Sequence, residues 1–255
     1  MLAPYSLRAM WGDPAASLDE AVDSNLKLMR CLVNCDRLFG DLWTSQARSR
    51  KTGQPRYIDR PLSPTKRAIL VEVSRRRQSQ RVETGGYPLL AHTSGPPSEQ
   101  VWLYTRFGSV PMNERGGLPN HIGITIPQEG VAPEHLMEPT TALRMLECVV
   151  TVASPVWGVL DHPKIASKEE RSTRMDAGVP DVGWLTYLRV PPKSLPELPP
   201  SATTFGVGAG SIIRAFPSRL DPDNPTHAEA IAMTRAALQN AGLLEPVQYW
   251  ARRRD

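Results

Sequence analysis

The chain has few of the residues that usually accompany covalent cross-links or a densely aromatic core. Aromatic residues make up only 6% of its 255 residues, so Leu, Val, Ile and Ala must fill most of the core. There are three cysteines, an odd number, and no CxxC pair. Cys31 and Cys35 lie four residues apart on a predicted helix and share a face, where we expect buried, reduced thiols.

Long apolar runs are also absent. No stretch approaches the roughly 18 consecutive apolar residues that a membrane-spanning helix needs. Residues 1–11 include Arg8 and lack the apolar run of a signal peptide. The sequence therefore predicts a cytoplasmic protein with no membrane partner.

Sequence motifs of known chemistry are missing as well. The histidines are scattered and form neither HxxxH nor HExxH, and there is no GxxxxGK or GxSxG. The glycine run 206–210 precedes a predicted strand, so it is expected to be a hairpin turn. Residues 221–224 open like a calcium loop, but Thr226 occupies the glycine position, which favours a turn into a helix. We expect no catalytic residue, metal, cofactor or small-molecule substrate, and predict a protein that is not an enzyme.

Proline and basic residues are abundant. The 25 prolines are about twice the usual frequency and predict long, stiff connections. Segment 46–86 contains eleven Lys/Arg and three acidic residues, a net charge of +8 in a chain of net charge +4. The basic character therefore belongs to one segment, and the rest of the chain is acidic.

Four arginines in this segment are the candidate partner-binding residues: Arg75, Arg76, Arg77 and Arg81. They follow an apolar run and have no aromatic residue between them, so they form either a solvated strand end or loop, or a site for an acidic macromolecule. If they bind a partner, changing all four to Ser should slow association and leave thermal stability nearly unchanged. Unaltered association would move the predicted interface to loop 161–181.

Helix signals occur at three places. Ser17 and Glu20 form a capping box, and the helix that follows is predicted to run to about Phe39, with Leu26 facing the core. A second helix is predicted over Pro139–Ala153, with Pro in its first turn. The last helix is predicted to open with a capping box at Thr226 and to end at Gly242.

The remaining elements are predicted strands and connections. Residues 44–66 are polar and basic, which predicts a long loop. Predicted strands cover 5–11, 68–73, 87–93, 101–107, 122–126, 155–160, 183–190, 203–207 and 211–216. Runs of strands between helices predict an α+β fold, with a largely antiparallel mixed sheet packed against about three helices. We expect one domain over 1–255 with a basic tail at 249–255; loop 161–181 is the best candidate for a boundary.

Three Trp-Gly pairs stand where the chain changes from one element to the next, and they carry a family resemblance. They are Trp11-Gly12, Trp157-Gly158 and Gly183-Trp184. A Trp buries a large surface, so these residues are expected in the core and not in a binding site. Their order, with the capping box at 17–20, the segment Asn120–Pro127, Leu198-Pro199 and the end at 241–244, resembles the immunity protein 52 family of bacterial polymorphic toxin systems. The resemblance spans about residues 5–245.

The resemblance implies an α+β protein that binds a cognate toxin, encoded by a neighbouring gene, in the cytoplasm. Toxins of this kind are often nucleases of the restriction-endonuclease-like type, delivered between competing bacteria. The alternative function is a nucleic-acid-binding protein that uses segment 46–86, whose affinity would fall steeply with salt.

Overall fold

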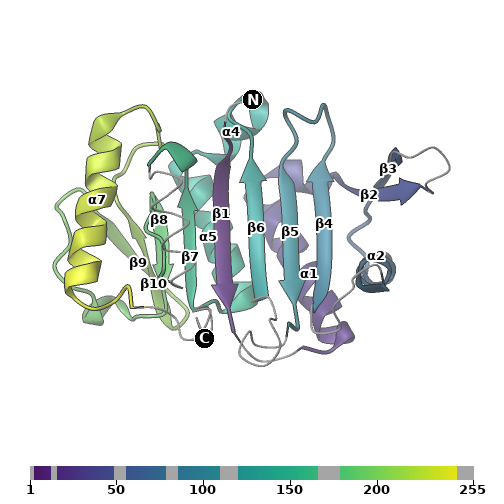
Figure 1. The fold of residues 1–255 in the computed structure, drawn as a ribbon, viewed down its shortest axis with the longest axis horizontal. Helices are drawn as coiled ribbons and strands as arrows, with labels where there is room; N and C mark the ends of the chain where they lie inside the picture. Colours follow the sequence, from purple (N-terminus) through teal and green to yellow (C-terminus); the bar gives the residue numbers. More distant parts are fainter. Residues whose placement is uncertain are drawn as a thin grey trace, which may run out of the picture.

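A computed structural model describes residues 3–12, 16–48, 56–78, 86–109, 120–165 and 179–245. Its centre is a ten-stranded sheet in the order β3-β2-β4-β5-β6-β1-β7-β8-β10-β9 (Figure 1). Every pair of neighbouring strands is antiparallel. The predicted α+β class is therefore confirmed. Among the described helices, none is long and apolar enough to cross a membrane.

The strands that sequence alternation predicted form the middle of the sheet. β1 (Tyr5–Trp11) lies between β6 (Asn120–Ile126) and β7 (Trp157–Asp161), and Leu7 aligns with Ile124 on one side and Leu160 on the other. Alternate residues of β1 and β6 are buried, as expected for strands with one face on the core. The other predicted strands in the sheet are β4 (Tyr87–Thr93), β5 (Trp102–Phe107), β8 (Leu185–Leu188) and β10 (Gly210–Arg214), with β9 (Thr203–Val207) at one edge.

Helices α1 (Leu18–Cys35) and α5 (Pro139–Ala153) cover one face of this sheet (Figure 1). The Thr105 hydroxyl of β5 donates a hydrogen bond of 2.6 Å to Asn25 of α1. A Cβ on Gly158 of β7 would meet Leu146 of α5 at 3.2 Å. α4 (Val131–Leu136) precedes α5, and α7 (Pro225–Asn240) lies at the β8–β10 side.

The helix starts are set by local side chains. Ser17 accepts from the Glu20 amide and Glu20 from the Ser17 amide, which confirms the predicted capping box. α1 ends earlier than predicted, because a 3₁₀ turn over Arg37–Gly40 follows Asp36. The predicted Thr226 capping box is wrong: Asn224 caps α7 and Pro225 takes the first helical position, for which its fixed φ is suited.

Two expectations between residues 42 and 78 are wrong. The predicted loop over 44–66 contains the hairpin β2 (Leu42–Arg48) and β3 (Arg56–Pro61), at the edge of the sheet. The predicted strand over 68–73 lies within helix α2 (Lys66–Gln78). In that helix Ile69 and Val73 are buried one turn apart, so a short apolar run satisfied helical spacing as well as a strand. The arginines of its last turn also suit the negative end of a helix dipole.

All three tryptophans of the Trp-Gly pairs lie in the core, as predicted. Trp11, Trp157 and Trp184 are 7%, 3% and 0% exposed. The indole nitrogens of Trp157 and Trp184 donate to the carbonyls of Asp181 and Phe216 at 2.7 Å and 3.1 Å. These residues therefore support the fold and do not present a binding surface.

The cysteines differ from the prediction of reduced thiols. Cys31 of α1 is disulfide-bonded to Cys148 of α5, which is 117 residues away, and Cys35 is the free cysteine. The Cys35 and Cys148 sulfur atoms lie 3.5 Å apart. Burial raises the pKa of the Cys35 thiol. The sequence shows that Cys31 and Cys35 share a face, but only the docking of α1 on α5 brings Cys148 to it.

The structure tests the predictions for two loops differently. The glycine run at 206–210 joins β9 to β10 as a hairpin, with Gly208 at φ +57°, so the predicted turn is confirmed. Loop 161–181 lies partly outside the described residues, which omit 166–178. Its first residue, Asp161, is the last residue of β7. β7 pairs with β8, so the strands before and after this loop are neighbours in one sheet.

A core prediction concerns α1. Leu26, Val22 and Met29 are 9%, 0% and 1% exposed, so the predicted stripe faces the core. We expect Leu26→Ala to cost roughly 2 kcal/mol of unfolding free energy, at the low end of the range for such changes because Leu26 lies at the margin of the core. Urea denaturation of both proteins measures this. A loss near zero would show that Leu26 contributes no packing.

Candidate partner-binding surface

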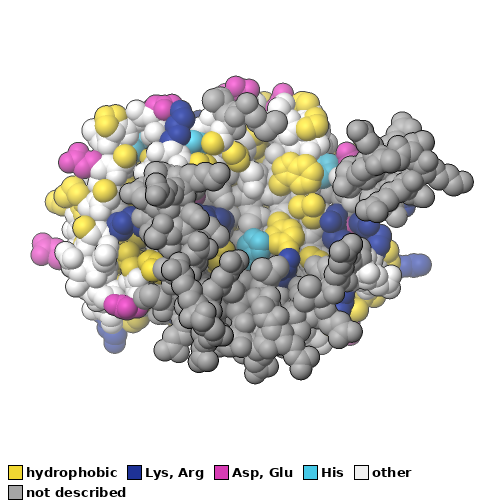
Figure 2. All heavy atoms as spheres, in the orientation of Figure 1, with side chains coloured by type: hydrophobic (Ala, Val, Ile, Leu, Met, Phe, Trp, Pro, Cys, Tyr) yellow, Lys and Arg dark blue, Asp and Glu magenta, His cyan; other side chains and the backbone are white. Residues whose placement is uncertain are grey.

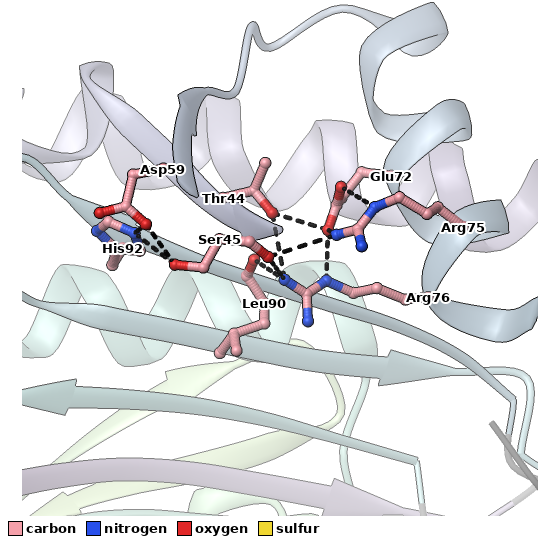
Figure 3. A network of polar contacts seen from close by, with 8 residues as sticks. All are labelled: Thr44, Ser45, Asp59, Glu72, Arg75, Arg76, Leu90 and His92. Atoms are coloured by element: carbon pink, nitrogen blue, oxygen red, sulfur yellow. Dashed lines mark hydrogen bonds and ion pairs between the residues drawn. The ribbon is translucent and has the colours of Figure 1, made fainter. Parts of the chain in front are cut away.

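The α2 arginines surround one buried carboxylate. Glu72 is 6% exposed, and its oxygens accept from Arg75 Nη2 at 2.6 Å, Arg75 Nε at 3.1 Å and Arg76 Nε (Figure 3). The Thr44 hydroxyl of β2 donates to the same carboxylate at 2.7 Å. Arg76 also reaches the carbonyls of Ser45 and Leu90 at 3.2 Å and 3.3 Å. The network therefore fastens α2 to the edge of the sheet.

The electrostatics of this network favour an ionised Glu72. Burial by itself would raise the pKa of the carboxyl group. The hydrogen bonds from Arg75 and Thr44, with the charge and hydrogen bond of Arg76, outweigh burial and keep the pKa of Glu72 below its ordinary value. Arg75 and Arg76 therefore each have an intramolecular carboxylate partner in the folded chain.

The predicted partner-binding residues fall into three situations. Arg75 and Arg76 are bound to Glu72, which rules out the expected solvated strand end for them. Arg77 is exposed, and its guanidinium lies 4.2 Å from the centroid of the Tyr87 ring, a cation–π geometry. Arg81 lies outside the described residues. The structure thus places two of the four within one cluster and a third beside it.

A groove lies next to this cluster, between α2 and the β2–β3 hairpin. Its volume is about 450 Å³. The lining of this α2 groove includes Arg67, Val71, Glu72 and Arg75 of α2, together with Arg60 of β3 and Leu62 after it. Arg60 and Arg67 were not predicted from the sequence as partner-binding residues. The signal was their place in the basic segment, but residues 56–61 had to be recognised as a strand before they could be paired with α2.

Ser45, Asp59 and His92 form a second polar cluster beside the network (Figure 3). The Ser45 hydroxyl donates to Asp59 at 2.6 Å and lies 3.3 Å from His92 Nε2. Asp59 is 3.5 Å from the same nitrogen, whereas His92 Nδ1 faces the Thr93 carbonyl at 2.9 Å. A hydrolytic triad needs the carboxylate and the nucleophile on opposite ring nitrogens. This cluster therefore joins three strands and has no triad geometry.

The sheet face opposite α1 and α5 carries a second group of side chains. Trp102, Tyr104 and Arg106 alternate along β5 with residues that face the helices, so they point the other way. Tyr104 lies beside His121 of β6, with ring centroids 4.7 Å apart, and accepts a 2.5 Å hydrogen bond from Arg106. Figure 2 looks onto this face and shows hydrophobic, basic and histidine side chains together near its centre. Trp, Tyr and Arg are the residues most enriched at binding hot spots.

A larger cavity, of about 680 Å³, opens at one end of this face. Its lining includes Trp102 and Thr125 from the sheet and Pro97 and Gln128 from loops. Glu129 is the single titratable side chain among the described residues that line it. The cavity therefore brings no acid–base pair together.

His121 predicts a pH dependence of stability. Burial, then the charges of Arg106 and Arg8, lower the pKa of His121 to about 4. An unfolded chain takes up this proton near pH 6.5, so the unfolding free energy should fall as pH drops from 6.5 to 4. We expect a loss of about 2 kcal/mol, discounted for the partial exposure of the ring. Urea denaturation at pH 7 and pH 4.5 measures this loss in the wild type and in a His121→Gln variant, which should show a smaller loss. An equal loss of unfolding free energy in the two proteins would contradict the prediction.

Comparison with known proteins identifies the family. The sequence matches the immunity protein 52 family over residues 4–247, and the chain belongs to that family. No match was found among curated proteins. The structure is similar to that of the Pseudomonas aeruginosa T6SS protein PA0821, with a TM-score of 0.50 and 14% sequence identity, over 95% of this chain and 73% of that one. At this identity the likeness concerns the fold alone.

Proposed function

We propose that this chain is a cognate immunity protein, which binds and neutralises a toxin encoded by a neighbouring gene. The observation that carries the proposal is membership of the immunity protein 52 family over nearly the whole chain. The likeness in fold to a protein described as a T6SS protein is consistent with it. The toxin is proposed to be a nuclease of the restriction-endonuclease-like type, as the family resemblance implies. Inhibition is proposed to occur by occlusion, not by catalysis.

The test is protection by the chain against candidate toxins. Each toxin from an adjacent gene is expressed with and without this chain, and growth is followed. Purified chain and catalytically inactive toxin are then mixed and analysed by size-exclusion chromatography. We expect rescued growth and a stable complex with one of them. If no toxin from a neighbouring gene is neutralised or bound, the proposal fails.

The proposed contact surface is the basic end of α2. A nuclease holds acidic metal ligands in its active site, and arginines can pair with them. Arg75, Arg76, Arg77 and Arg81 are proposed to contact the toxin, although Arg75 and Arg76 also serve Glu72. An Arg77→Ser variant separates the roles, because Arg77 is exposed and has a ring contact but no ion pair among the described residues. We expect it to associate more slowly at low salt and to unfold as the wild type does.

We place this binding in the cytoplasm, as the resemblance implies. The Cys31–Cys148 disulfide weighs against that placement, because cytosolic reductants keep most thiols reduced. Alkylation of free thiols in intact cells, followed by mass spectrometry, distinguishes the two states. A cytoplasmic chain should be alkylated at Cys31 and Cys148. A bonded pair throughout the cellular pool would overturn the cytoplasmic placement.

A second candidate function is nucleic-acid binding by segment 46–86, which the charge of +8 favours. It predicts an affinity that falls steeply with salt. The arrangement of Arg75 and Arg76 counts against it, since Glu72 already neutralises part of their charge. Titration of labelled duplex and single-stranded DNA and RNA at 50 and 200 mM salt decides, and no binding at either salt removes this function.

A further inference from the structure

One stripe of α2 combines basic and apolar side chains. Arg67, Val71 and Arg75 are spaced four residues apart and line the α2 groove together. Val71 is 60% exposed, which makes it the most exposed large hydrophobic side chain among the described residues. An apolar side chain that is exposed in a groove is a natural contact for another apolar side chain.

The opposite wall of the groove comes from β3 and the residues after it. Arg60 of β3 is exposed and belongs to the lining, which also includes Pro61 and Leu62. The groove lining thus combines the apolar side chains of Val71, Pro61 and Leu62 with guanidinium groups. The sequence separates these parts, and the turn between β3 and α2 brings them together.

The arginines of the groove differ in what they already bind. Arg75 forms an ion pair with Glu72 at 2.6 Å. Arg60 and Arg67 have no ion pair with any carboxylate in the described part of the chain. Two positive charges of the groove lining therefore remain for a partner, together with an exposed valine.

We propose that the α2 groove receives an acidic segment of the cognate toxin, in which an apolar side chain is flanked by carboxylates. The apolar side chain packs on Val71, and the carboxylates pair with Arg60 and Arg67. This inference rests on the proposed function and extends the proposed contact surface from the basic end of α2 to the α2 groove. Planar guanidinium groups suit carboxylates because they can form two parallel hydrogen bonds.

The groove suits a peptide segment better than a nucleic acid. A phosphate backbone would use the two arginines but gains nothing from Val71, Pro61 and Leu62. Bases would need aromatic platforms, and the described lining of this groove contains none. A ligand contacts both the arginines and the apolar side chains of the groove only if it carries carboxylates and an apolar side chain together.

The test compares variants of the groove with matched controls in binding to inactive toxin from the adjacent gene. Arg60→Ser/Arg67→Ser removes two charges from the groove. Lys193→Glu changes the net charge equally in the 3₁₀ turn η3 (Pro192–Ser194), beside β9, the strand at the other end of the sheet. Val71→Asp is matched by Met233→Asp, because Met233 is 50% exposed on α7. All changes are at exposed positions, and circular dichroism with thermal unfolding checks that each variant folds.

We expect the double arginine variant to bind about tenfold or more weakly, mostly through slower association, and Val71→Asp about 100-fold more weakly. The two controls should stay within about threefold of wild type. Wild-type affinity in both groove variants would overturn the groove proposal and leave the proposed function standing. A wild-type chain that binds no toxin would overturn the proposed function and the groove proposal with it.

A second measurement identifies what lies in the groove. Benzoylphenylalanine is placed at position 71, or at position 233 as the control, and the complex is irradiated and analysed by mass spectrometry. We expect a cross-link only from position 71, to a toxin segment that contains at least two acidic residues. A cross-link to a segment without acidic residues, or none while binding persists, would contradict the proposal. Binding of a 20-nucleotide duplex that the Arg60→Ser/Arg67→Ser variant loses would show instead that the groove takes phosphates.

Discussion

Replacing Arg75 and Arg76 together by serine should destabilise the fold by about 3–5 kcal/mol, because it leaves a buried carboxylate without its charged partners. Glu72 is 6% exposed and receives hydrogen bonds from both arginines. Arg76 also satisfies the Ser45 and Leu90 carbonyls of two strands. Urea denaturation at pH 7 measures the loss. This expectation differs from the prediction from sequence that changing Arg75, Arg76, Arg77 and Arg81 to Ser leaves thermal stability nearly unchanged.

The pH dependence of this loss gives the cause. The pKa of Glu72 is lowered in the folded chain, so its ionised form stabilises the fold above the ordinary carboxyl pKa. That stability is lost as pH falls through the lowered pKa. In the double variant the carboxyl group can protonate, so the difference from wild type should shrink in acid. Glu72→Gln in the double variant should restore part of the stability at pH 7. An unchanged difference from pH 7 to pH 4 would show that lost packing is responsible.

Removing the disulfide bond between α1 and α5 should also lower the unfolding free energy by a large amount. The Cys31–Cys148 bond closes a chain segment of 117 residues. Loop-closure entropy predicts a loss of up to about 4.7 kcal/mol when such a link is absent from the unfolded chain. We expect Cys148→Ser to show most of this loss in urea denaturation of the oxidised protein. Wild type in dithiothreitol should unfold at the same urea concentration as the variant.

Cys35 supplies a control for this experiment. Its sulfur lies 3.5 Å from that of Cys148, so it can replace Cys31 as the partner when Cys31 is changed. We therefore expect oxidised Cys31→Ser to form a Cys35–Cys148 bond and to keep most of the stability, while Cys31→Ser/Cys35→Ser loses it. Equal stability of all variants and the wild type, with the bond verified by mass spectrometry, would show that the link does not restrain the unfolded chain.

Local chemistry made the central part of the fold predictable. The capping box at Ser17 and Glu20 depends on side chains three residues apart, and strict alternation along β1 and β6 depends on the two faces of a strand. Both signals are complete within a few residues. The same holds for the glycine turn at 206–210, where Gly208 takes a positive φ.

The predictions around α2 failed because short apolar runs have no unique period. Residues 68–73 fit a strand, but α2 buries Ile69 and Val73 against neighbours that lie far away in sequence. The β2–β3 hairpin is polar and basic because it forms the edge of the sheet, so its composition resembled a loop. Edge strands keep few of the apolar residues by which strands are recognised.

The candidate site, too, was predicted only in part from the sequence. The sequence showed that segment 46–86 is strongly basic and that Arg75, Arg76 and Arg77 lie together. It did not show which arginines are bound to Glu72 and which face solvent, because Thr44, Glu72 and Leu90 come from three different elements. Only the structure shows that Arg60 and Arg67 of the α2 groove have no carboxylate partner among the described residues.

By itself the sequence determined the α+β class, the position of β1, α1, α5 and the central strands, the buried tryptophans and the location of positive charge. Helix capping and strand alternation depend on residues close together in the chain, and composition is a property of the sequence itself, so all three can be recognised without the tertiary structure. The tertiary structure alone decided that residues 66–78 form a helix, that Cys31 is bonded to Cys148, and that Arg60 and Arg67 line one groove with Val71. Each of these depends on residues that are distant in sequence and come together only when the helices and the hairpin pack on the sheet.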